Sequence, residues 1–265
     1  MKISSIFYLS LFTFFLLSFS NCKKDDDTPE PPVVRTIEDV EADFSAIDIS
    51  AGVHDETLEF TGGKSWDFRV IAPPTSGTQT YPLVIHLHGS AASGDVDAHK
   101  STDCYVEPGF ENMDVFIISP NSGGEIWNSL RNQEKVVNLV LLARNLWPID
   151  MDKIIVTGYS DGGNGSWFFG ETQPELFAAA IPMASSYSTI STDGSVRVMP
   201  IPMYVIHGEN DDLFPVGNTQ DWITQTNDAG SDITFVIAPG LEHNEPCSYV
   251  SYLEDAVVWL TENIW

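Results

Sequence analysis

The sequence predicts one doubly wound α/β domain, with about eight mostly parallel strands and helices on both faces of the sheet. Two observations predict this fold. Short, continuously apolar runs recur from Glu56 onward, as expected of strands buried on both faces. Segments with helical spacing lie between them, the clearest over residues 132–146. Hydrophobic residues make up 43% and charged residues 19%, which indicates a globular protein.

The elements can be placed in chain order. Residues 57–61 and 66–72 flank Gly62 and Gly63, and this pattern predicts an antiparallel hairpin. A closing helix is expected over residues 249–264. The remaining strands are expected at residues 81–88, 115–119, 154–157, 178–183, 203–206 and 233–238.

The first 21 residues have the layout of an export signal. Lys2 precedes an apolar run over residues 6–19, which is too short to span a bilayer comfortably. Cys22 follows, and a charged stretch, Lys-Lys-Asp-Asp-Asp, comes after it. This arrangement resembles a bacterial lipoprotein signal, similar to those of many Bacteroidota, although Asn21 departs from the small residue usual before the cysteine. The resemblance implies lipidation at Cys22; an ordinary signal peptide cut nearby is the alternative.

We therefore expect three parts: a signal over 1–21, a lipid-anchored linker and lead-in over 22–53, and a catalytic domain over 54–265. The linker includes the stiff Thr-Pro-Glu-Pro-Pro stretch at 28–32. The expected location is the cell envelope, on the periplasmic or outer surface, with the anchor as the only membrane contact. An exported compartment permits a disulfide between Cys104 and Cys247, but the sequence leaves that pairing open.

The chain carries 38 Asp and Glu against 12 Lys and Arg, a formal net charge of −26. Such a field repels nucleic acid and anionic polymers, so neutral or weakly charged substrates are expected. A purely solubilising acidic surface is the alternative. Neither a metal site nor a cofactor is expected, since no Cys/His cluster and no phosphate-binding glycine loop is visible.

Gly158-Tyr159-Ser160-Asp161-Gly162 lies between an expected strand and an expected helix. In that context Gly-x-Ser-x-Gly places a serine on a sharp, strained turn, with glycines where side chains would collide with neighbouring elements. A serine nucleophile also needs a base and an orienting carboxylate. Residues 207–215 follow a strand and offer Glu209, Asp211 and Asp212 as the acid. The loop after the last strand offers His243 as the base.

These motifs resemble one branch of the α/β-hydrolases, which contains feruloyl and acetyl-xylan esterases and poly(3-hydroxybutyrate) depolymerase-like esterases. The resemblance rests on His-Leu-His-Gly at 86–89, Gly-Tyr-Ser-Asp-Gly-Gly at 158–163, the loop 207–215, and Gln-Pro-Glu-Leu-Phe-Ala-Ala-Ala-Ile-Pro at 173–182. It covers roughly residues 55–265 and implies that Asp211 is the acid, with Asp212 and Glu209 as rivals. The other histidines, His54, His86, His88, His99 and His207, are expected to be structural.

The oxyanion hole needs two backbone amides. One is expected from Asp161 and the other from Ser90, with Ala91 as the alternative. The Asp161 carboxylate is expected to point away from the developing charge. Trp127 lies on the loop after the fourth expected strand, at the edge where ligands bind in open α/β sheets. It is a candidate to stack on a sugar or phenolic ring, with packing beneath the loop as the alternative.

The sequence thus predicts an exported serine esterase acting through an acyl-enzyme, with acetyl or feruloyl esters on polysaccharide as the expected substrates. Two other functions stay open. One is a polyester or oligoester depolymerase, or a peptidase, with the same triad. The other is a silent hydrolase fold that serves as a surface binding protein.

Overall fold

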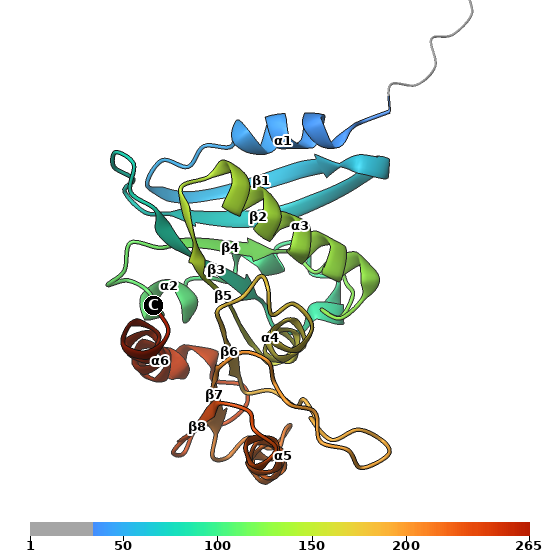
Figure 1. Cartoon of the computed structure of the whole chain (residues 1–265), viewed down its shortest axis with the longest axis vertical. Coiled ribbons are helices and arrows are strands. Elements are labelled where there is room, and N and C mark those ends of the chain that lie inside the picture. The colour runs from blue at the N-terminus through green and yellow to red at the C-terminus, as the bar shows by residue number, and fades with distance from the viewer. Residues whose placement is uncertain (1–33) are drawn as a thin grey trace, which may run out of the picture. The chain divides into compact units, whose positions relative to one another are not determined.

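The computed structural model describes residues 34–265 of the chain. The expected signal over 1–21, Cys22 and the expected linker up to residue 33 lie outside the described residues. The described part holds one eight-stranded sheet in the order β1-β2-β4-β3-β5-β6-β7-β8 (Figure 1). The strands are β1 (Gly52–Phe60), β2 (Lys64–Ala72), β3 (Tyr81–Leu87), β4 (Phe116–Pro120), β5 (Ile149–Tyr159), β6 (Ala179–Met183), β7 (Met203–Gly208) and β8 (Ile233–Ala238).

Strand direction follows the predicted pattern. β1 and β2 form an antiparallel hairpin around Gly62 and Gly63, and β2 is also antiparallel to β4. Every other pairing in the sheet is parallel, from β4–β3 through to β7–β8. The fold class predicted from the sequence is therefore confirmed. Because the carboxyl ends of parallel strands share one edge, the loops after β3, β4, β5, β7 and β8 all emerge on that edge.

Two apolar layers cover the sheet. One contains buried residues of α1, α3, α4 and α5, and the other contains buried residues of α2 and α6. Figure 1 shows α2 and α6 together on one side of the sheet and the other four helices on the opposite side. The helices are α1 (Ile37–Ser45), α2 (Val106–Gly109), α3 (Leu130–Leu146), α4 (Asp161–Thr172), α5 (Val216–Asp228) and α6 (Val250–Asn263).

Helix α1 lies within residues 22–53, for which the sequence predicts a linker and lead-in to the packed domain. Thr36 caps the helix, and its side chain and that of Asp39 form a reciprocal capping box. Val40 and Phe44 are one turn apart and fully buried, and the Phe44 ring stacks on Trp147 at 4.6 Å between centroids. The packed unit therefore begins before residue 54. This helix is hard to predict from the sequence, because Val40 and Phe44 are its only buried side chains.

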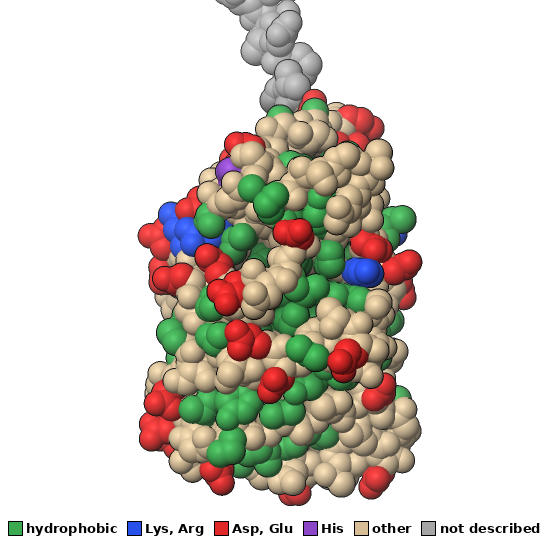
Figure 2. All heavy atoms as spheres, turned by 90° about the vertical axis from the view of Figure 1, so that its left-hand side faces the viewer, with side chains coloured by type: hydrophobic (Ala, Val, Ile, Leu, Met, Phe, Trp, Pro, Cys, Tyr) green, Lys and Arg blue, Asp and Glu red, His purple; other side chains and the backbone are tan. Residues whose placement is uncertain are grey.

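The surface of the described part is strongly acidic. Figure 2 shows Asp and Glu side chains scattered over one face, with apolar side chains between them and few Lys or Arg. Among residues 34–265, no helix is both long and apolar enough to cross a membrane.

Candidate active site

Ser160 occupies a strained turn between β5 and α4. Its backbone has φ 57° and ψ −119°, a conformation that few side-chain-bearing residues adopt. The flanking glycines make the turn possible. A Cβ on Gly158 would lie 2.5 Å from the carbonyl oxygen of Leu87, and one on Gly162 would overlap that same carbonyl. The Ser160 amide donates to the Met183 carbonyl at 3.0 Å, so the turn is also held by β6.

The structure brings Ser160, His243 and Asp211 into one hydrogen-bonded chain. Ser160 Oγ lies 2.9 Å from His243 Nε2, and His243 Nδ1 lies 2.8 Å from Asp211 Oδ2. The second Asp211 oxygen accepts the backbone N–H groups of Leu213 and Phe214 at 3.1 and 2.7 Å. Both the acid and the imidazole are buried, whereas Ser160 is partly exposed. This arrangement can take the serine proton and hold the resulting imidazolium against a carboxylate.

The three acids of the β7 loop differ in burial and in their contacts. Asp212 and Glu209 are exposed, and Glu209 accepts the Gly240 amide instead of facing the imidazole. Only Asp211 of the three contacts His243. His207 lies behind it, with its Nε2 donating to the Phe214 carbonyl and lying 3.4 Å from Asp211 Oδ2. Burial lowers the pKa of His207, so this second histidine stays neutral beside the acid.

The two backbone amides expected to form an oxyanion hole, those of Asp161 and Ser90, lie on either side of the nucleophile turn in the chain. Asp161 is the first residue of α4, and Ser90 is in the left-handed region with φ 49°. Within the described residues, neither amide donates a hydrogen bond. The amide of Ala91, the alternative to Ser90, donates to Asp161 Oδ2 at 3.0 Å. This bond occupies the Ala91 amide, ties the β3 loop to α4 and engages the Asp161 carboxylate.

Trp127 is almost wholly buried beneath the loop after β4. The side chain is only 2% exposed, and its indole N–H donates to the His88 carbonyl at 3.0 Å. The indole ring of Trp127 and the imidazole ring of His88 pack edge to face, with their centroids 5.0 Å apart. The structure shows the alternative of packing beneath the loop, where Trp127 supports the segment leading to Ser90. The same side chain also lines a smaller cavity beside α4, so a role in substrate binding stays a prediction.

His88 is held in one neutral tautomer by two partners. The Nδ1–H donates to the Gly89 carbonyl at 2.8 Å, and Nε2 accepts the Ser122 amide at 3.1 Å. Burial lowers its pKa, which agrees with that neutral state. His86 is likewise buried between Ser119 and Tyr105, and burial lowers its pKa from 6.5 to about 3. Neither histidine contacts the serine in the structure.

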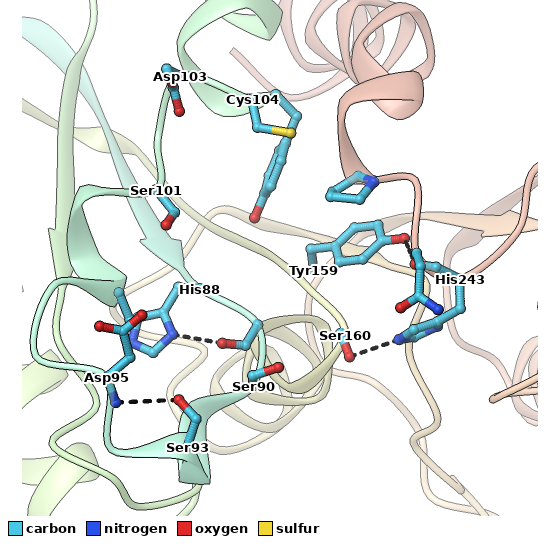
Figure 3. A pocket seen from close by; sticks show the side chains of 15 residues that line it. His88, Ser90, Ser93, Asp95, Ser101, Asp103, Cys104, Tyr159, Ser160 and His243 are labelled. Atoms are coloured by element: carbon cyan, nitrogen blue, oxygen red, sulfur yellow. Dashed lines mark hydrogen bonds between the residues drawn. The ribbon is translucent and has the colours of Figure 1, made fainter.

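A cavity of about 560 Å³ opens beside Ser160 and His243 (Figure 3). Its wall opposite the histidine comes from the loop after β3 and carries small hydroxyls and two carboxylates. No Lys or Arg is among its lining residues. Those that Figure 3 labels around the cavity, apart from Ser160 and His243, are His88, Ser90, Ser93, Asp95, Ser101, Asp103, Cys104 and Tyr159.

Two contacts that the sequence does not reveal hold the histidine loop. Cys104 and Cys247 form a disulfide, with Cα atoms 4.7 Å apart, and Cys104 lines the cavity. The open question of that pairing is thus answered. The Tyr159 hydroxyl donates to the backbone carbonyl of His243. Tyr159 stands directly before the nucleophile, and that position was the one available signal for its role.

No group of His, Cys, Asp or Glu among residues 34–265 is arranged to hold a metal ion.

A family model, described as the dienelactone hydrolase family, matches residues 119–257, slightly more than half of the chain. The matched segment includes Ser160, Asp211 and His243. It begins after the loop that carries Ser90. No curated protein matches the chain in sequence.

Several solved structures share the fold. A thermostable esterase is 23% identical with a TM-score of 0.65, over 79% of this chain and 62% of that one, so the match spans less than two-thirds of its length. The fluorophosphonate-binding serine hydrolase F of Staphylococcus aureus is 15% identical with a TM-score of 0.67, over 81% and 100%. A truncated carbohydrate esterase from gut microbiota is 17% identical with a TM-score of 0.61, over 74% and 90%.

Proposed function

The chain belongs to the dienelactone hydrolase family, and we propose that it is a serine esterase that cleaves carboxylic esters through an acyl-enzyme. The observation that carries the proposal is the continuous chain from Ser160 Oγ through His243 to Asp211, at 2.9 and 2.8 Å. The family is named for lactones, which are cyclic esters. The narrower likeness to feruloyl and acetyl-xylan esterases remains a prediction.

The proposed reaction has two halves. Ser160 Oγ attacks the ester carbonyl carbon while His243 Nε2 takes its proton, and Asp211 stabilises the imidazolium. The carbonyl oxygen becomes an oxyanion facing the amides of Ser90 and Asp161. The bond from carbon to the alcohol oxygen then breaks, and His243 gives its proton to that oxygen. Water repeats the sequence on the acyl-enzyme and releases the acid.

We propose acetyl or feruloyl esters on polysaccharide as substrates. Hydroxyl and carboxylate groups line the cavity beside His243, which favours a neutral, hydrogen-bonding alcohol such as a sugar. The overall charge of −26 disfavours anionic polymers.

We further propose export and anchoring through Cys22. The disulfide between Cys104 and Cys247 supports an oxidising compartment, because such bonds are rare in reducing ones. The anchor itself rests on the sequence alone.

A second candidate is hydrolysis of a short polyester. Three large apolar side chains are exposed on loops that carry site residues: Val96 at 76%, Ile126 at 53% and Leu213 at 59%. Such side chains around a catalytic cleft suit contact with an apolar polymer.

The test is release of acid from acetylated and feruloylated xylan by the soluble domain, with Ser160→Ala as the matched control. Release of acetate or ferulate by the wild type alone supports a carbohydrate esterase. If only a small activated ester is cleaved, the chemistry stands and short polyesters are the next substrates. Turnover by a folded Ser160→Ala variant overturns the proposal.

A further inference from the structure

A second, smaller cavity lies beside Asp161, the residue that follows the nucleophile. Its volume is about 220 Å³, and Asp161, Asn164, Gly165 and Phe168 provide one wall. These four residues share one face of α4, which begins directly after Ser160. The opposite wall comes from Ile126, Trp127 and Asn128 of the loop after β4, and from Ser186 and Tyr187 after β6.

The two cavities differ in chemistry. The larger one contains Ser160, His243 and Asn244, together with three further serines, two aspartates and two tyrosines. The smaller one contains none of the triad, and four of its nine lining residues are large and apolar or aromatic. Consecutive residues line the two cavities, Ser160 the larger one and Asp161 the smaller one.

The smaller cavity has a rigid wall. The Tyr187 ring stacks on Trp167 at 5.8 Å, nearly parallel, and its hydroxyl donates to Glu171. The Arg197 guanidinium lies 5.4 Å from the ring and pairs with Glu171. Asn164 Oδ1 accepts the Ser186 amide at 2.8 Å, which joins α4 to the β6 loop. Pre-organised walls of this kind discriminate ligands by size.

The direction of proton transfer assigns the two halves of an ester. The leaving alcohol oxygen must face His243 Nε2 to receive its proton, so the alcohol lies in the cavity that His243 lines. The oxyanion faces the Ser90 and Asp161 amides. The remaining substituent of the tetrahedral carbon is the acyl chain, which points away from His243 toward the Asp161 side.

We propose that the small cavity between α4 and residues 126–128 binds the acyl group, and that the large polar cavity binds the alcohol. The proposal rests on the esterase function proposed above and deepens it. It makes the substrate an ester of a compact, apolar acyl group with a bulkier, uncharged polar alcohol. Ile126, 53% exposed at the rim of the small cavity, is then a specificity-determining residue.

The test uses the variant Ile126→Trp, which narrows the small cavity. Its substrates are p-nitrophenyl acetate, butanoate and octanoate, which share one alcohol and differ only in the acyl chain. Losing room for one or two methylenes should lower the kcat/KM ratio of butanoate to acetate about ten-fold or more. Asn128→Trp, on the same wall, provides a second narrowing variant. Leu130→Trp is the matched control, because Leu130 is 84% exposed and lines neither cavity.

A reciprocal variant separates the two cavities. Ser101→Trp, in the large cavity, should leave the butanoate-to-acetate ratio unchanged and alter the ratio between a phenyl acetate and an acetylated xyloside. The proposal is overturned if both narrowing variants keep the wild-type acyl ratio, or if they change the alcohol ratio instead. A wild type that cleaves none of these esters refutes the proposed function itself, which is a distinguishable result.

Discussion

Ser160 and His243 meet at 2.9 Å, yet the segments that carry them are held in different ways. The serine turn is fixed by main-chain packing: strand β5 before it, helix α4 after it, and glycines that let three backbone segments touch. The histidine lies on a loop between β8 and α6 with no regular structure around it until Pro246. Side chains and a covalent link hold that loop, through the Tyr159 hydroxyl, Asp211 and the disulfide.

The difference teaches where each half of the site is vulnerable. The serine turn has no room for an added side-chain atom at Gly158 or Gly162, because backbone atoms lie against both glycines. Its geometry depends little on the side chains of residues far away in the chain. The histidine loop tolerates changes of local sequence but depends on partners far away in the chain, at residues 104, 159 and 211. We therefore expect substitutions in the turn to act on folding, and substitutions around the loop to act on activity and local stability.

The largest effect is expected from Gly162→Ala. Its Cβ would overlap the Leu87 carbonyl, which is backbone of the central strand β3 and cannot move aside. We expect loss of soluble, folded protein, measured by circular dichroism and thermal melting. Gly217→Ala in α5 is the matched control, because nothing lies within 4 Å of its added Cβ. That control should change stability by less than about 1 kcal/mol. A Gly162→Ala protein with wild-type melting would show that the turn is not fixed by main-chain packing.

The next largest effect is expected on kcat alone. Asp211→Asn keeps the size of the side chain and removes the charge that stabilises the imidazolium. We expect kcat to fall by about 10⁴-fold, as when the acid of a comparable triad is changed to asparagine, with little change in melting temperature. Asp212→Asn, one residue along and exposed, should stay near wild-type activity. The reverse ranking of the two variants would refute the role proposed for Asp211.

The same contrast explains how much could be predicted from the sequence. All eight strands and the order of turn, acid loop and histidine loop could be predicted, because buried strands and Gly-x-Ser-x-Gly are local patterns. The choice of Asp211 needed a family resemblance, since three acidic residues lie within four positions. Only the structure shows that Asp211 turns inward, with its carboxylate held by the amides of Leu213 and Phe214.

Long-range contacts account for the rest. The disulfide joins residues that are 143 positions apart in the chain, and the sequence does not show how close their Cα atoms lie in space. Helix α1 depends on packing of Phe44 against Trp147, about a hundred residues away in the chain, which no local periodicity near residue 44 reveals. The position of Trp127 could not be chosen from the sequence, because a tryptophan on a loop at the ligand-binding edge suits either burial or stacking. Its indole N–H bonds to the His88 carbonyl, a partner 39 residues away.

The smallest effect is expected from removing the disulfide. It tests most directly whether the serine turn and the histidine loop are held independently. Cys104→Ala with Cys247→Ala should lower stability by about 2–4 kcal/mol, because the cross-link closes a long loop in the unfolded chain. In a chain of this size that corresponds to a fall of about 5–15 °C in melting temperature. The fold should survive, since the sheet and both apolar layers are untouched.

The loosening should also be local. Cys247 follows His243 by four residues, so amides of residues 241–249 should exchange with deuterium faster in the double variant. Amides of residues 158–163, held by β6 and α4, should keep wild-type protection. A few-fold drop in kcat with unchanged KM should accompany this, because the imidazole spends less time within reach of Ser160. Equal loss of protection in both segments would mean that the turn and the loop form one cooperative unit, and the distinction drawn between them would fail.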